Sequence, residues 1–563
     1  MYIREKIEDQ IRALIQKSLE TAVEAGDFSL ASMPEIHLEV PREKEHGDYA
    51  TNVAMQLPKQ AKKAPRVIAE SIVKHFDIDG SYVEEIDIAG PGFINFRLKP
   101  EWIYEVLLEI KDMGGDYGRS TGNTGKKYNL EFISANPTGP MHMGNARGGA
   151  IGDILASIAQ WTGYEVTREF YVNDAGNQIA KFGDSLDARF RQLMGQDIPF
   201  PEDGYQGGDI RVHMEEFIAK EGGEAACEKY LAMDEGERKK IFVDYALEKN
   251  LKKMHKDLED YGIVYDVWFS EQSLYDSGAI ESALQTLKDR SAVYEKEGAL
   301  WFETSKYGCE KDDVLIRQNG LPTYFMGDIA YHLNKFMTRG FDRCVNVWGA
   351  DHHGHIARLK AAMAAAGVNP DNLEIVIMQL VRLMRDGEIA RMSKRKGEMI
   401  SLTDLIEEVG RDAARFLFNM RSPDSHLDFD LDLAIEQSNE NPVFYVQYAH
   451  ARICSILRQM AEDVTEKDAV NLTLLKEKEE INLITMLANL PEEIIIAEDK
   501  MDPSRITRYA MDLASAFHSF YNACRVRVED VALMKARLAL IEATKQVLTN
   551  VLGILGVEAP ERM

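Results

Sequence analysis

Residues 128–172 read YNLEFISANPTGPMHMGNARGGAIGDILASIAQWTGYEVTREFYV, and their pattern indicates the fold class. Apolar residues run through 128–134 and predict a strand, the Gly/Pro-rich segment after it predicts a turn, and 146–163 has the pattern of a long helix. A second strand is predicted over 165–174. The succession of strand, turn, helix and strand is typical of a βαβ unit in a parallel sheet.

Strand patterns return downstream at 344–351 (CVNVWGAD) and 373–381 (LEIVIMQLV), which predicts that the same sheet continues there. The residues between the two sets of strands are acidic and mostly helical in pattern. We therefore expect an α/β domain over 116–430, with a helical insertion at about 180–300 between the two halves of its parallel sheet.

The two ends of the chain predict two further units. A mixed α/β domain is expected over 1–115, from a helix at 3–25, a strand at 36–40, a Gly-Pro turn and strand at 89–98, and a helix at 101–113. From 431 to 563 nearly all apolar residues follow helical spacing, which predicts an all-α bundle. The chain is therefore expected to be a multidomain α/β protein.

Composition limits the possible functions. The chain has 563 residues, with 66 Lys and Arg against 93 Asp and Glu, so its net charge of −27 argues against a general nucleic-acid coat but allows a local basic patch. Its five cysteines are scattered without a C-x-x-C pair, so we expect neither a disulfide framework nor a structural zinc site, and a reducing cytoplasm fits. No signal peptide and no membrane span are expected.

The first candidate site is NPTGPMHMGN, 136–145. Here a helix begins where a buried strand ends, which brings free backbone N–H groups to the carboxyl edge of a parallel sheet, where nucleotides bind in such folds. His142 and Asn145 are three residues apart and share one face of this helix start, so both could donate to a phosphate. The alternative is that His142 only caps the helix and the glycines only pack.

The second candidate site is ARMSKRKG, 390–397, which gathers Arg391, Lys394, Arg395 and Lys396 around Ser393. A loop of cations is what a triphosphate and its leaving pyrophosphate need. The alternative is a solvated surface loop. The first site follows the first strand of the sheet and the second follows the last, so the two can meet at one site.

These motifs resemble a known family. HMGN resembles the "HIGH" motif and RMSK the "KMSK" motif of class I aminoacyl-tRNA synthetases. The surrounding segments narrow the resemblance to arginyl-tRNA synthetase: EFISANPTGPMHMGNARG, REFYVNDAGNQI, GLPTYFMGDIAYH, WGADHHGHIARLKAA, and DAARF, which is similar to "DALR". Two departures are Asn145 where the pattern often has His, and Arg391 where it has Lys. An amide can still donate a hydrogen bond but cannot titrate.

The resemblance implies a Rossmann-type catalytic core, an N-terminal added domain at the tRNA elbow and a C-terminal anticodon-binding bundle. The implied reaction joins L-arginine to tRNA(Arg) in two displacements. The arginine carboxylate attacks the α-phosphate of ATP, and the 2′-hydroxyl of the terminal adenosine of the tRNA then attacks the arginyl-adenylate. ATP with Mg²⁺, arginine and tRNA are the implied partners, and the implied enzyme is a cytoplasmic monomer that requires bound tRNA for efficient adenylate formation.

The free amino acid arginine needs carboxylates for its planar guanidinium. Tyr324 and Asp328 are four residues apart and share one helix face, and the resemblance implies that they read the side chain, with Glu271 as a second acidic reader. Ser134 and Asn136 precede the turn and fit the amino acid's own ammonium and carboxylate by position and resemblance. Outside the motif, Asp328 would be an exposed helix carboxylate and Asn136 an ordinary turn residue.

The resemblance places ATP against the first turn and the GADHHGH segment. The expected ATP-binding residues are Pro137, Gly139, His142, Gly144, Asn145, Gly349, Asp351 and Lys394. Catalytic roles are expected for His142 and Asn145, for Lys394 as the main cation on the leaving group, and for Arg391 and Ser393 beside it. No metal site is expected in GADHHGH, because no H-x-x-x-H pair is present there.

Transfer RNA contacts are expected on two domains. On the bundle, unstacked bases need aromatic faces and amide or guanidinium donors, which Tyr445, Gln447, Tyr448 and Arg452 supply together with the end of the chain at Met563. The alternative is that these side chains pack a seam of the bundle. On the N-terminal domain, Phe93 and Asn95 share one face of a strand and could hold a flipped base, although Phe93 could equally pack the core.

Three competing interpretations remain open at this point. The first motif alone would allow a glutamyl or cysteinyl synthetase, although no zinc-ligand set supports the cysteinyl type. A small-molecule nucleotidyltransferase shares H-x-G-H chemistry but does not need the C-terminal helices. A non-catalytic relative is disfavoured by His142, Asp328 and Lys394.

Overall fold

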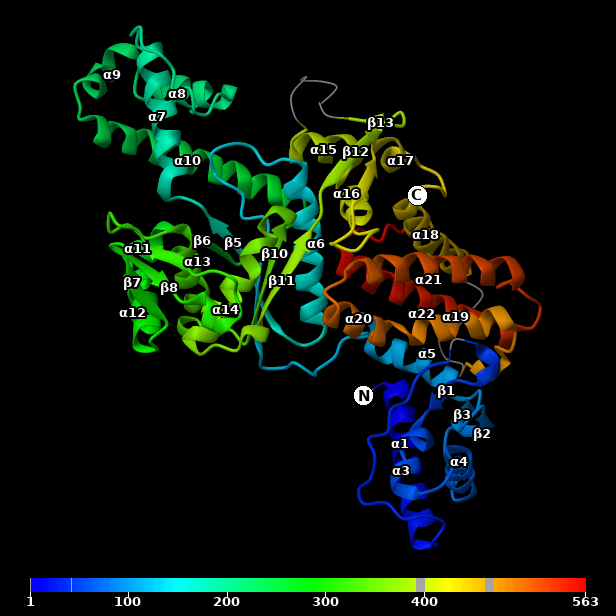
Figure 1. Ribbon diagram of the computed structural model, residues 1–563. Coiled ribbons are helices and arrows are strands. Elements are labelled where there is room, and N and C mark those ends of the chain that lie inside the picture. Colours follow the sequence, from blue (N-terminus) through cyan, green and yellow to red (C-terminus); the bar gives the residue numbers. More distant parts are fainter. Residues whose placement is uncertain (1, 42, 391–399, 461–469) are drawn as a thin grey trace.

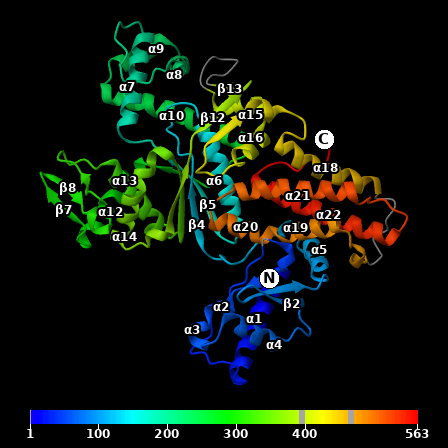
Figure 2. The same ribbon diagram turned by 45° about the vertical axis from the view of Figure 1, so that its right-hand side comes forward.

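The computed structural model describes residues 2–41, 43–390, 400–460 and 470–563 of the chain. Figure 1 shows a sheet-containing domain beside a helical bundle, with the N-terminal domain below the bundle and a helical lobe projecting from the top of the sheet domain. In Figure 2, turned by 45°, the lobe and the N-terminal domain still stand apart from the body.

A five-stranded parallel sheet forms the centre of the molecule. Its strand order is β11-β10-β4-β5-β6, with bounds β4 Lys127–Glu131, β5 Glu165–Val172, β6 Val267–Ser270, β10 Arg343–Gly349 and β11 Leu373–Met378. If these five strands are numbered 1 to 5 along the chain, their order from the β6 edge is 3-2-1-4-5, which is that of the Rossmann fold. The direction of winding reverses between β4 and β10, and ligands bind at the carboxyl end of such a switch point.

Helix α6 (Met143–Trp161) follows β4 and is buried along most of its length. Its approach to the sheet depends on glycine: a Cβ at Gly152 would lie 2.2 Å from the ring of Phe132, and one at Gly149 would lie 2.8 Å from Ile263. The predicted βαβ unit is therefore present, and small residues let its helix lie close against the strand.

The insertion between β5 and β6 is a helical lobe with its own apolar core. It consists of α7 Gly176–Leu193, α8 Gly208–Lys220, α9 Glu224–Leu231 and α10 Glu235–Asp260. The expected range of about 180–300 is too long, because β6 returns to the central sheet at Val267. The chain then forms α11 Gln272–Asp276, α12 Ala279–Asp289, a small antiparallel sheet (β7 Val293–Lys296, β8 Ala299–Phe302, β9 Asp313–Ile316) and α13 Tyr324–Leu333.

Helix α13 continues into a π-helical turn, Asn334–Thr338, and α14 (Ile356–Ala366) connects β10 to β11. After β11 the chain leaves the central sheet. It forms a second small sheet, with β12 Val381–Arg385, β13 Glu388–Ile389 and β14 Leu427–Asp430, together with α15 Leu402–Val409 and α16 Arg411–Phe418. The basic motif therefore follows β13 of this second sheet and not directly the last strand of the central one.

The C-terminal part is an all-α bundle, as expected. Its helices are α17 Leu431–Ile435, α18 Pro442–Met460, α19 Lys478–Ala488, α20 Leu490–Asp499, α21 Ser504–Ala523 and α22 Val531–Leu555. By length and composition α22 could cross a membrane, alone among the helices of the described residues, and 67% of its most apolar window is buried inside the protein. It packs against α18, α19, α21 and α5, which is the environment of a core helix.

The N-terminal domain has a three-stranded sheet of order β1-β3-β2, against which α2 and α4 pack, and α1 packs on α4. Its elements are α1 Ile3–Glu24, β1 Tyr49–Thr51, α2 Val53–Gln56, α3 Pro58–Ala61, α4 Pro65–Lys74, β2 Val83–Ala89, β3 Phe93–Leu98 and α5 Trp102–Met113. The strand expected at 36–40 is wrong: only Glu39 pairs there, in a single bridge to Ala50. Strand β2 was not predicted, and α5 packs on α19 and α22 of the bundle.

Candidate active site

The first motif lies at the switch point of the sheet. His142 is the N-cap of α6: its Nδ1 accepts a hydrogen bond from the Gly144 N–H at 3.1 Å, while its own N–H donates to Asn145 Oδ1 at 3.0 Å. Because Nδ1 accepts, Nε2 of the neutral ring carries the proton and is a donor. Loss of water around the ring lowers the pKa of His142, although the residue as a whole is exposed. His142 can therefore cap the helix with Nδ1 and still donate a hydrogen bond from Nε2.

The chain between β4 and the motif is held in an unusual backbone conformation. Ile133 and Ser134 both have positive φ, at 67° and 46°, a region that is costly for residues other than glycine and that clusters at functional sites. Ser134 Oγ donates to Glu131 Oε1 at 3.1 Å and accepts from the Tyr171 N–H at 3.1 Å. Asn173 Nδ2 holds the Ser134 carbonyl at 3.2 Å. The turn toward Asn136 is thus fixed from two neighbouring strands.

A chain of buried hydrogen bonds runs beneath the site. Lys335, on the π-helical turn, donates to Glu131 Oε2 at 2.8 Å and to Asn346 Oδ1 at 3.1 Å. Asn346 Nδ2 in turn lies 2.8 Å from His332 Nε2, and His332 Nδ1 lies 2.7 Å from the Asp328 carbonyl. Burial and the nearby Lys335 hold the pKa of His332 well below its usual value. The network connects Ser134 to Asp328 through the floor of the site.

The candidate side-chain readers lie together at the base of this network. Tyr324 and Asp328 start α13, and Tyr324 is 57% exposed beside Gly176 of the helical lobe. Glu271, at the end of β6, is buried, and burial together with the charges of Asp328 and Asp174 raises its pKa to about 7. His355 Nε2 lies 2.7 Å from Asp328 Oδ2. Glu271 and Asp328 are close enough for the charge of one to act on the other, and Tyr324 lies beside them, so the three predicted readers lie together.

The predicted ATP-binding turn contacts the helical lobe. Asn136 is exposed, and Pro137 behind it is buried, with its carbonyl accepting from Asn250 Nδ2 of α10 at 2.8 Å. The ring of His142 lies over Gly144, where a Cβ would be 3.1 Å from it. Gly139 is half-buried in the same turn.

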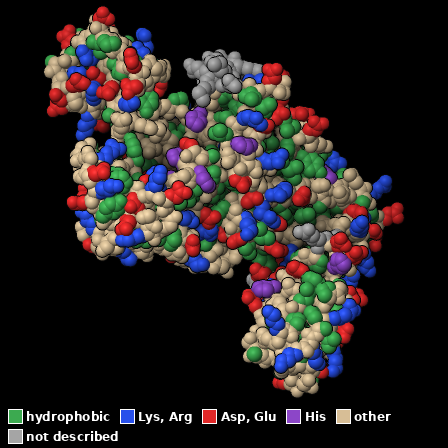
Figure 3. All heavy atoms as spheres, in the orientation of Figure 1, with side chains coloured by type: hydrophobic (Ala, Val, Ile, Leu, Met, Phe, Trp, Pro, Cys, Tyr) green, Lys and Arg blue, Asp and Glu red, His purple; other side chains and the backbone are tan. Residues whose placement is uncertain are grey.

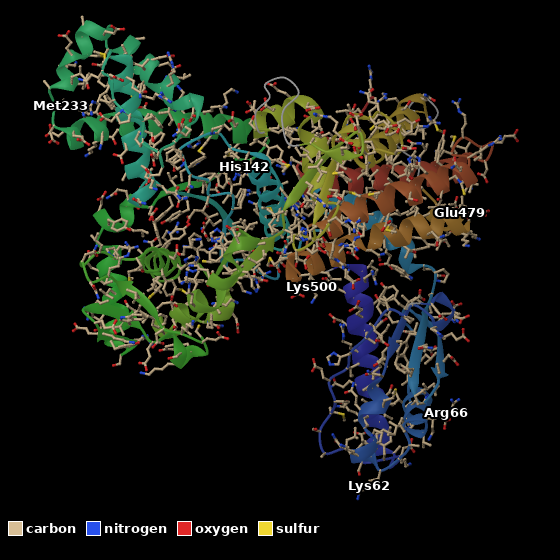
Figure 4. The ribbon with its side chains drawn as sticks, turned by 45° about the horizontal axis from the view of Figure 1, so that its top comes forward. Lys62, Arg66, His142, Met233, Glu479 and Lys500 are labelled. Carbon is tan, nitrogen blue, oxygen red and sulfur yellow. The ribbon has the colours of Figure 1, made fainter. Side chains whose placement is uncertain are left out.

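The second predicted ATP segment begins where β10 ends. A Cβ at Gly349 would lie 2.6 Å from Asp351 Oδ1, so glycine lets the exposed Asp351 turn back over the end of the strand. Since β10 neighbours β4, this segment and the His142 turn occupy adjacent positions at the same sheet edge. Figure 3 shows histidine side chains gathered in the hollow beside the helical lobe, and Figure 4 labels His142 in the middle of the molecule.

The basic motif itself, including Arg391, Ser393 and Lys394, lies outside the described residues. The chain on its C-terminal side returns to the first motif: Ser401 pairs with His142 in an antiparallel bridge, and the Leu402 N–H donates to the Met141 carbonyl at 3.0 Å. The described chain that follows the second motif therefore lies against the first motif.

The predicted tRNA residues of the bundle lie on α18, facing α21 and the C-terminal segment. The rings of Tyr445 and Tyr448 lie 4.9 and 6.2 Å from His518, and Arg452 donates to the hydroxyl of Tyr521 at 3.1 Å. These three side chains are half-buried, so they pack a seam and still reach the surface.

The C-terminal segment lies along the same helix. Gln447 Nε2 donates to Asp412 Oδ2 and to the Glu558 carbonyl, both at 3.0 Å, and His450 lies 2.9 Å from the Pro560 carbonyl. Met563 is 54% exposed. Gln447 therefore holds the C-terminal segment at Glu558 against α18. This role could not be predicted from the sequence.

On the N-terminal domain, Phe93 and Asn95 stand on the face of β3 that alternates with the core positions. Phe93 is half-buried, and Asn95 is only 6% exposed between its partners Ala50 and Asp87. Among the described residues, the three potential metal ligands that lie close together are the exposed Glu43, Glu45 and His46 of this domain, far from the sheet edge in sequence and fold.

Glu131 and Lys335 were missed by sequence reasoning. A charged residue inside the buried strand YNLEFIS was the available signal for Glu131, because such a residue is buried only when it is paired. Nothing in the sequence near Lys335 indicates its partner.

Three family models cover almost the whole chain. Residues 9–98 match the arginyl tRNA synthetase N terminal domain, 110–454 match the tRNA synthetases class I (R), catalytic domain, and 446–563 match the DALR anticodon binding domain. Similar curated proteins include the arginine–tRNA ligases of Ruminiclostridium cellulolyticum and Caldanaerobacter subterraneus, each 56% identical over 100% of both chains.

Solved structures agree with this. A putative arginyl-tRNA synthetase from Campylobacter jejuni is 35% identical, with a TM-score of 0.74 over 83% of this chain and 100% of its own. The Thermus thermophilus arginyl-tRNA synthetase has the same TM-score at 21% identity over 98% of this chain and 100% of its own, which shows a shared fold.

The Rossmann order of the parallel sheet and the place of the His142 turn at its switch point, together with the catalytic-domain match, define a class I aminoacyl-tRNA synthetase. The full-length relatives exclude the glutamyl, cysteinyl and nucleotidyltransferase alternatives. The chain belongs to the arginyl-tRNA synthetase family.

Proposed function

We propose that this arginine–tRNA ligase holds the guanidinium of its substrate between Asp328 and Glu271, with Tyr324 against its plane. The observation that carries the proposal is that two carboxylates and an exposed aromatic ring lie close together, where burial and the charge of Asp328 raise the pKa of Glu271 to about 7. A buried carboxyl group with a second carboxylate beside it calls for a cation. Two carboxylates match the planar fork of arginine, whereas lysine presents a single point charge.

The α-amino and carboxylate groups of arginine would meet Asn136 and Ser134. Asn136 is exposed at the turn, and the strained backbone of Ser134 is held by Glu131 and Asn173. This arrangement supports the proposal because the turn lies between the acidic pocket and the N-terminus of α6, where the carboxylate must meet the α-phosphate of ATP.

ATP would lie across the start of α6. The Nε2–H of His142 and the side-chain amide nitrogen of Asn145 would donate to phosphate at the positive end of the helix, whose backbone N–H groups at Gly144 and Asn145 already donate to His142. Pro137, Gly139 and Gly144 would let the nucleotide approach the backbone, while Gly349 and Asp351 would meet the adenosine.

The basic segment after β13 would complete the ATP site. We assign Lys394 as the main cation on the leaving pyrophosphate, with Arg391 and Ser393 beside it. Support comes from Ser401, which returns the chain to His142. ATP would enter as its Mg²⁺ complex, and the ion would neutralise phosphate charge.

The reaction then proceeds in two displacements. The arginine carboxylate attacks the α-phosphate, the bond to pyrophosphate breaks, and arginyl-adenylate forms. The 2′-hydroxyl of the terminal adenosine of tRNA(Arg) attacks the carbonyl of the adenylate and AMP leaves. Alignment and stabilisation of phosphate charge accelerate both steps, so no protein nucleophile is required.

Transfer RNA would contact both appended domains. On the bundle, Tyr445, Tyr448 and Arg452 offer rings and a guanidinium at the surface of α18 for anticodon bases, and Gln447 would act by holding the C-terminal segment that ends at Met563. On the N-terminal domain, Phe93 and Asn95 would hold a base of the elbow. Figure 4 shows Lys62 and Arg66 at the far end of this domain, where cations can meet phosphates.

We further propose domain limits of 1–115, 116–430 and 431–563, a monomer in solution and a cytoplasmic location. The first limit groups α5 with the N-terminal domain by sequence, although α5 packs on the bundle.

Aminoacylation kinetics of Asp328→Asn test the pocket. We expect the KM for arginine to rise about 10- to 100-fold, because one charged hydrogen bond to the guanidinium is lost, while the KM for ATP stays within about twofold. Asp371→Asn, at the exposed 3-10 turn before β11, is a matched control and should leave both values unchanged. An unchanged KM for arginine in Asp328→Asn would contradict the assigned pocket.

A further inference from the structure

The carboxylate of Asp328 is already held by another side chain. His355, the last residue of the 3-10 turn Ala350–His355 after β10, places Nε2 2.7 Å from Asp328 Oδ2. The side chain of His355 is 12% exposed and that of Asp328 is 37% exposed, so the histidine lies behind the carboxylate and not in front of it. One oxygen of Asp328 is therefore engaged from within the protein, and the other is left to the pocket.

Arg358 fixes the protonation of this histidine. Its Nε donates to His355 Nδ1 at 2.6 Å, so Nδ1 must carry a lone pair and the ring proton must be on Nε2, pointing at Asp328. The ring is then a neutral donor. A neutral donor orients the carboxylate without cancelling its charge, whereas a lysine or arginine at this position would neutralise the pocket.

A second carboxylate anchors Arg358. Its Nη1 donates to Asp313 Oδ1 at 2.9 Å, and its guanidinium lies 4.8 Å from the ring centroid of Phe325. The ring of Phe325 also lies 5.4 Å from His355, at an interplanar angle of 75°. The chain Asp313–Arg358–His355–Asp328 therefore connects β9 of the small antiparallel sheet, α14 and α13 through three hydrogen bonds, and Phe325 packs against two of its members.

We propose that His355 is a positioning residue for arginine selection: it holds Asp328 in the single rotamer that presents Oδ1 to the guanidinium, and Arg358 and Asp313 hold His355 in the required tautomer. This inference rests on the proposed role of Asp328 in binding arginine. It gives the small sheet β7–β9 a function in the site, because Asp313 is its contribution. A carboxylate that is free to rotate would divide its time among rotamers and bind the guanidinium more weakly.

The chain offers a geometrically matched test. In glutamine the side-chain amide nitrogen can occupy the place of His355 Nε2 and donate to Asp328, whereas in asparagine it reaches only the place of Nδ1. His355→Gln and His355→Asn are both polar and differ by one methylene. They are to be compared in aminoacylation of tRNA(Arg) by the full chain, with thermal melting to confirm folding and His37→Leu, an exposed site of the N-terminal domain, as control.

We expect His355→Asn to raise the KM for arginine about tenfold or more, the size of one lost hydrogen bond to a charged group, with the KM for ATP within about twofold. His355→Gln should restore most of the affinity, and His37→Leu should match the parent. A purely structural role would lower the melting temperature or kcat in both variants without separating them by the KM for arginine.

Two results overturn the proposal and are distinguishable. If Asp328→Asn raises the KM for arginine while His355→Asn and His355→Gln behave alike, the pocket stands and the positioning role of His355 is wrong. If Asp328→Asn leaves the KM for arginine unchanged, the proposed pocket fails, and the role of His355 fails with it.

Discussion

Glu271 is the residue whose charge depends most directly on whether the arginine pocket is filled. Burial is the main cause that raises the pKa of Glu271 to about 7, and the charge of Asp328 is the second. Near neutral pH, without bound arginine, the Glu271 carboxyl group is therefore partly protonated. A guanidinium favours the ionised form and lowers the pKa again. Arginine binding should therefore release protons near pH 7.

This predicts that arginine binds more tightly as the pH rises from about 6 to 8, by up to about tenfold per pH unit below the pKa of the empty site. Calorimetry of arginine binding in two buffers with different ionisation enthalpies measures the protons released. Glu271→Gln should abolish most of the release. Proton uptake on binding, or release that the Gln variant retains, would contradict the assignment of Glu271.

Residue-level prediction from sequence succeeded where partners are close along the chain. Tyr324 and Asp328 are one helical turn apart, so their shared face follows from spacing alone. Glu271 was reached only through resemblance, and the Glu131–Lys335 pair could not be predicted, because 204 residues separate the two partners. His355 was considered only as a metal-ligand candidate, since its contact with Asp328 depends on the packing of α13 against α14.

At the scale of elements, the packing of α6 on β4 depends on Gly152. A Cβ there would lie 2.2 to 2.5 Å from three atoms of Phe132, and Phe132 is itself fully buried. Gly152→Ala should therefore destabilise the fold by about 1–3 kcal/mol, the usual cost of overpacking a core. Urea unfolding followed by circular dichroism measures the change.

Gly553 provides the control, because it is exposed on α22 and a Cβ there meets nothing within 4 Å. Gly553→Ala should stabilise the protein by about 0.5–1 kcal/mol, since alanine is the better helix former. Equal effects of the two substitutions would contradict the close approach of α6 to Phe132.

The long, strongly patterned elements could be predicted from sequence, and the short ones could not. The buried parallel strands and α6 have continuous apolar runs or helical periods. Segment 36–40 alternates like a strand but makes a single bridge, because only Glu39 finds a partner, at Ala50. Strand β2 is half exposed and rich in acidic residues, and β6 has four residues, too few to stand out inside an otherwise helical region.

At the scale of the whole molecule, Arg415 joins the catalytic domain to the bundle. It is fully buried, pairs with Asp153 of α6 at 2.5 Å, and donates to the carbonyl of Leu555 at the end of α22 at 3.1 Å. Gly556 makes room for it, since a Cβ there would lie 2.2 Å from the guanidinium. The arginine of the DAARF segment is thus a junction between domains, a role that sequence spacing does not reveal.

Arg415→Met should lower stability by about 3 kcal/mol, because it leaves a buried carboxylate with Arg168 as its remaining ion-pair partner. Thermal melting measures the loss, and Arg382→Met, whose ion pair with Asp428 is exposed, is the control, with an expected change below about 1 kcal/mol. Similar losses in both variants would contradict the role of Arg415 as a buried junction.

Asp328 and Glu271, close together beside the carboxyl edge of the sheet, are proposed to select arginine for activation by ATP. Pyrophosphate exchange into ATP, measured with each of the twenty amino acids in the presence and absence of tRNA, tests this selection most directly. We expect exchange with arginine alone, appearing when tRNA is added and lost in Asp328→Asn at low arginine concentration. Exchange with another amino acid, or with arginine undiminished by Asp328→Asn, would contradict it.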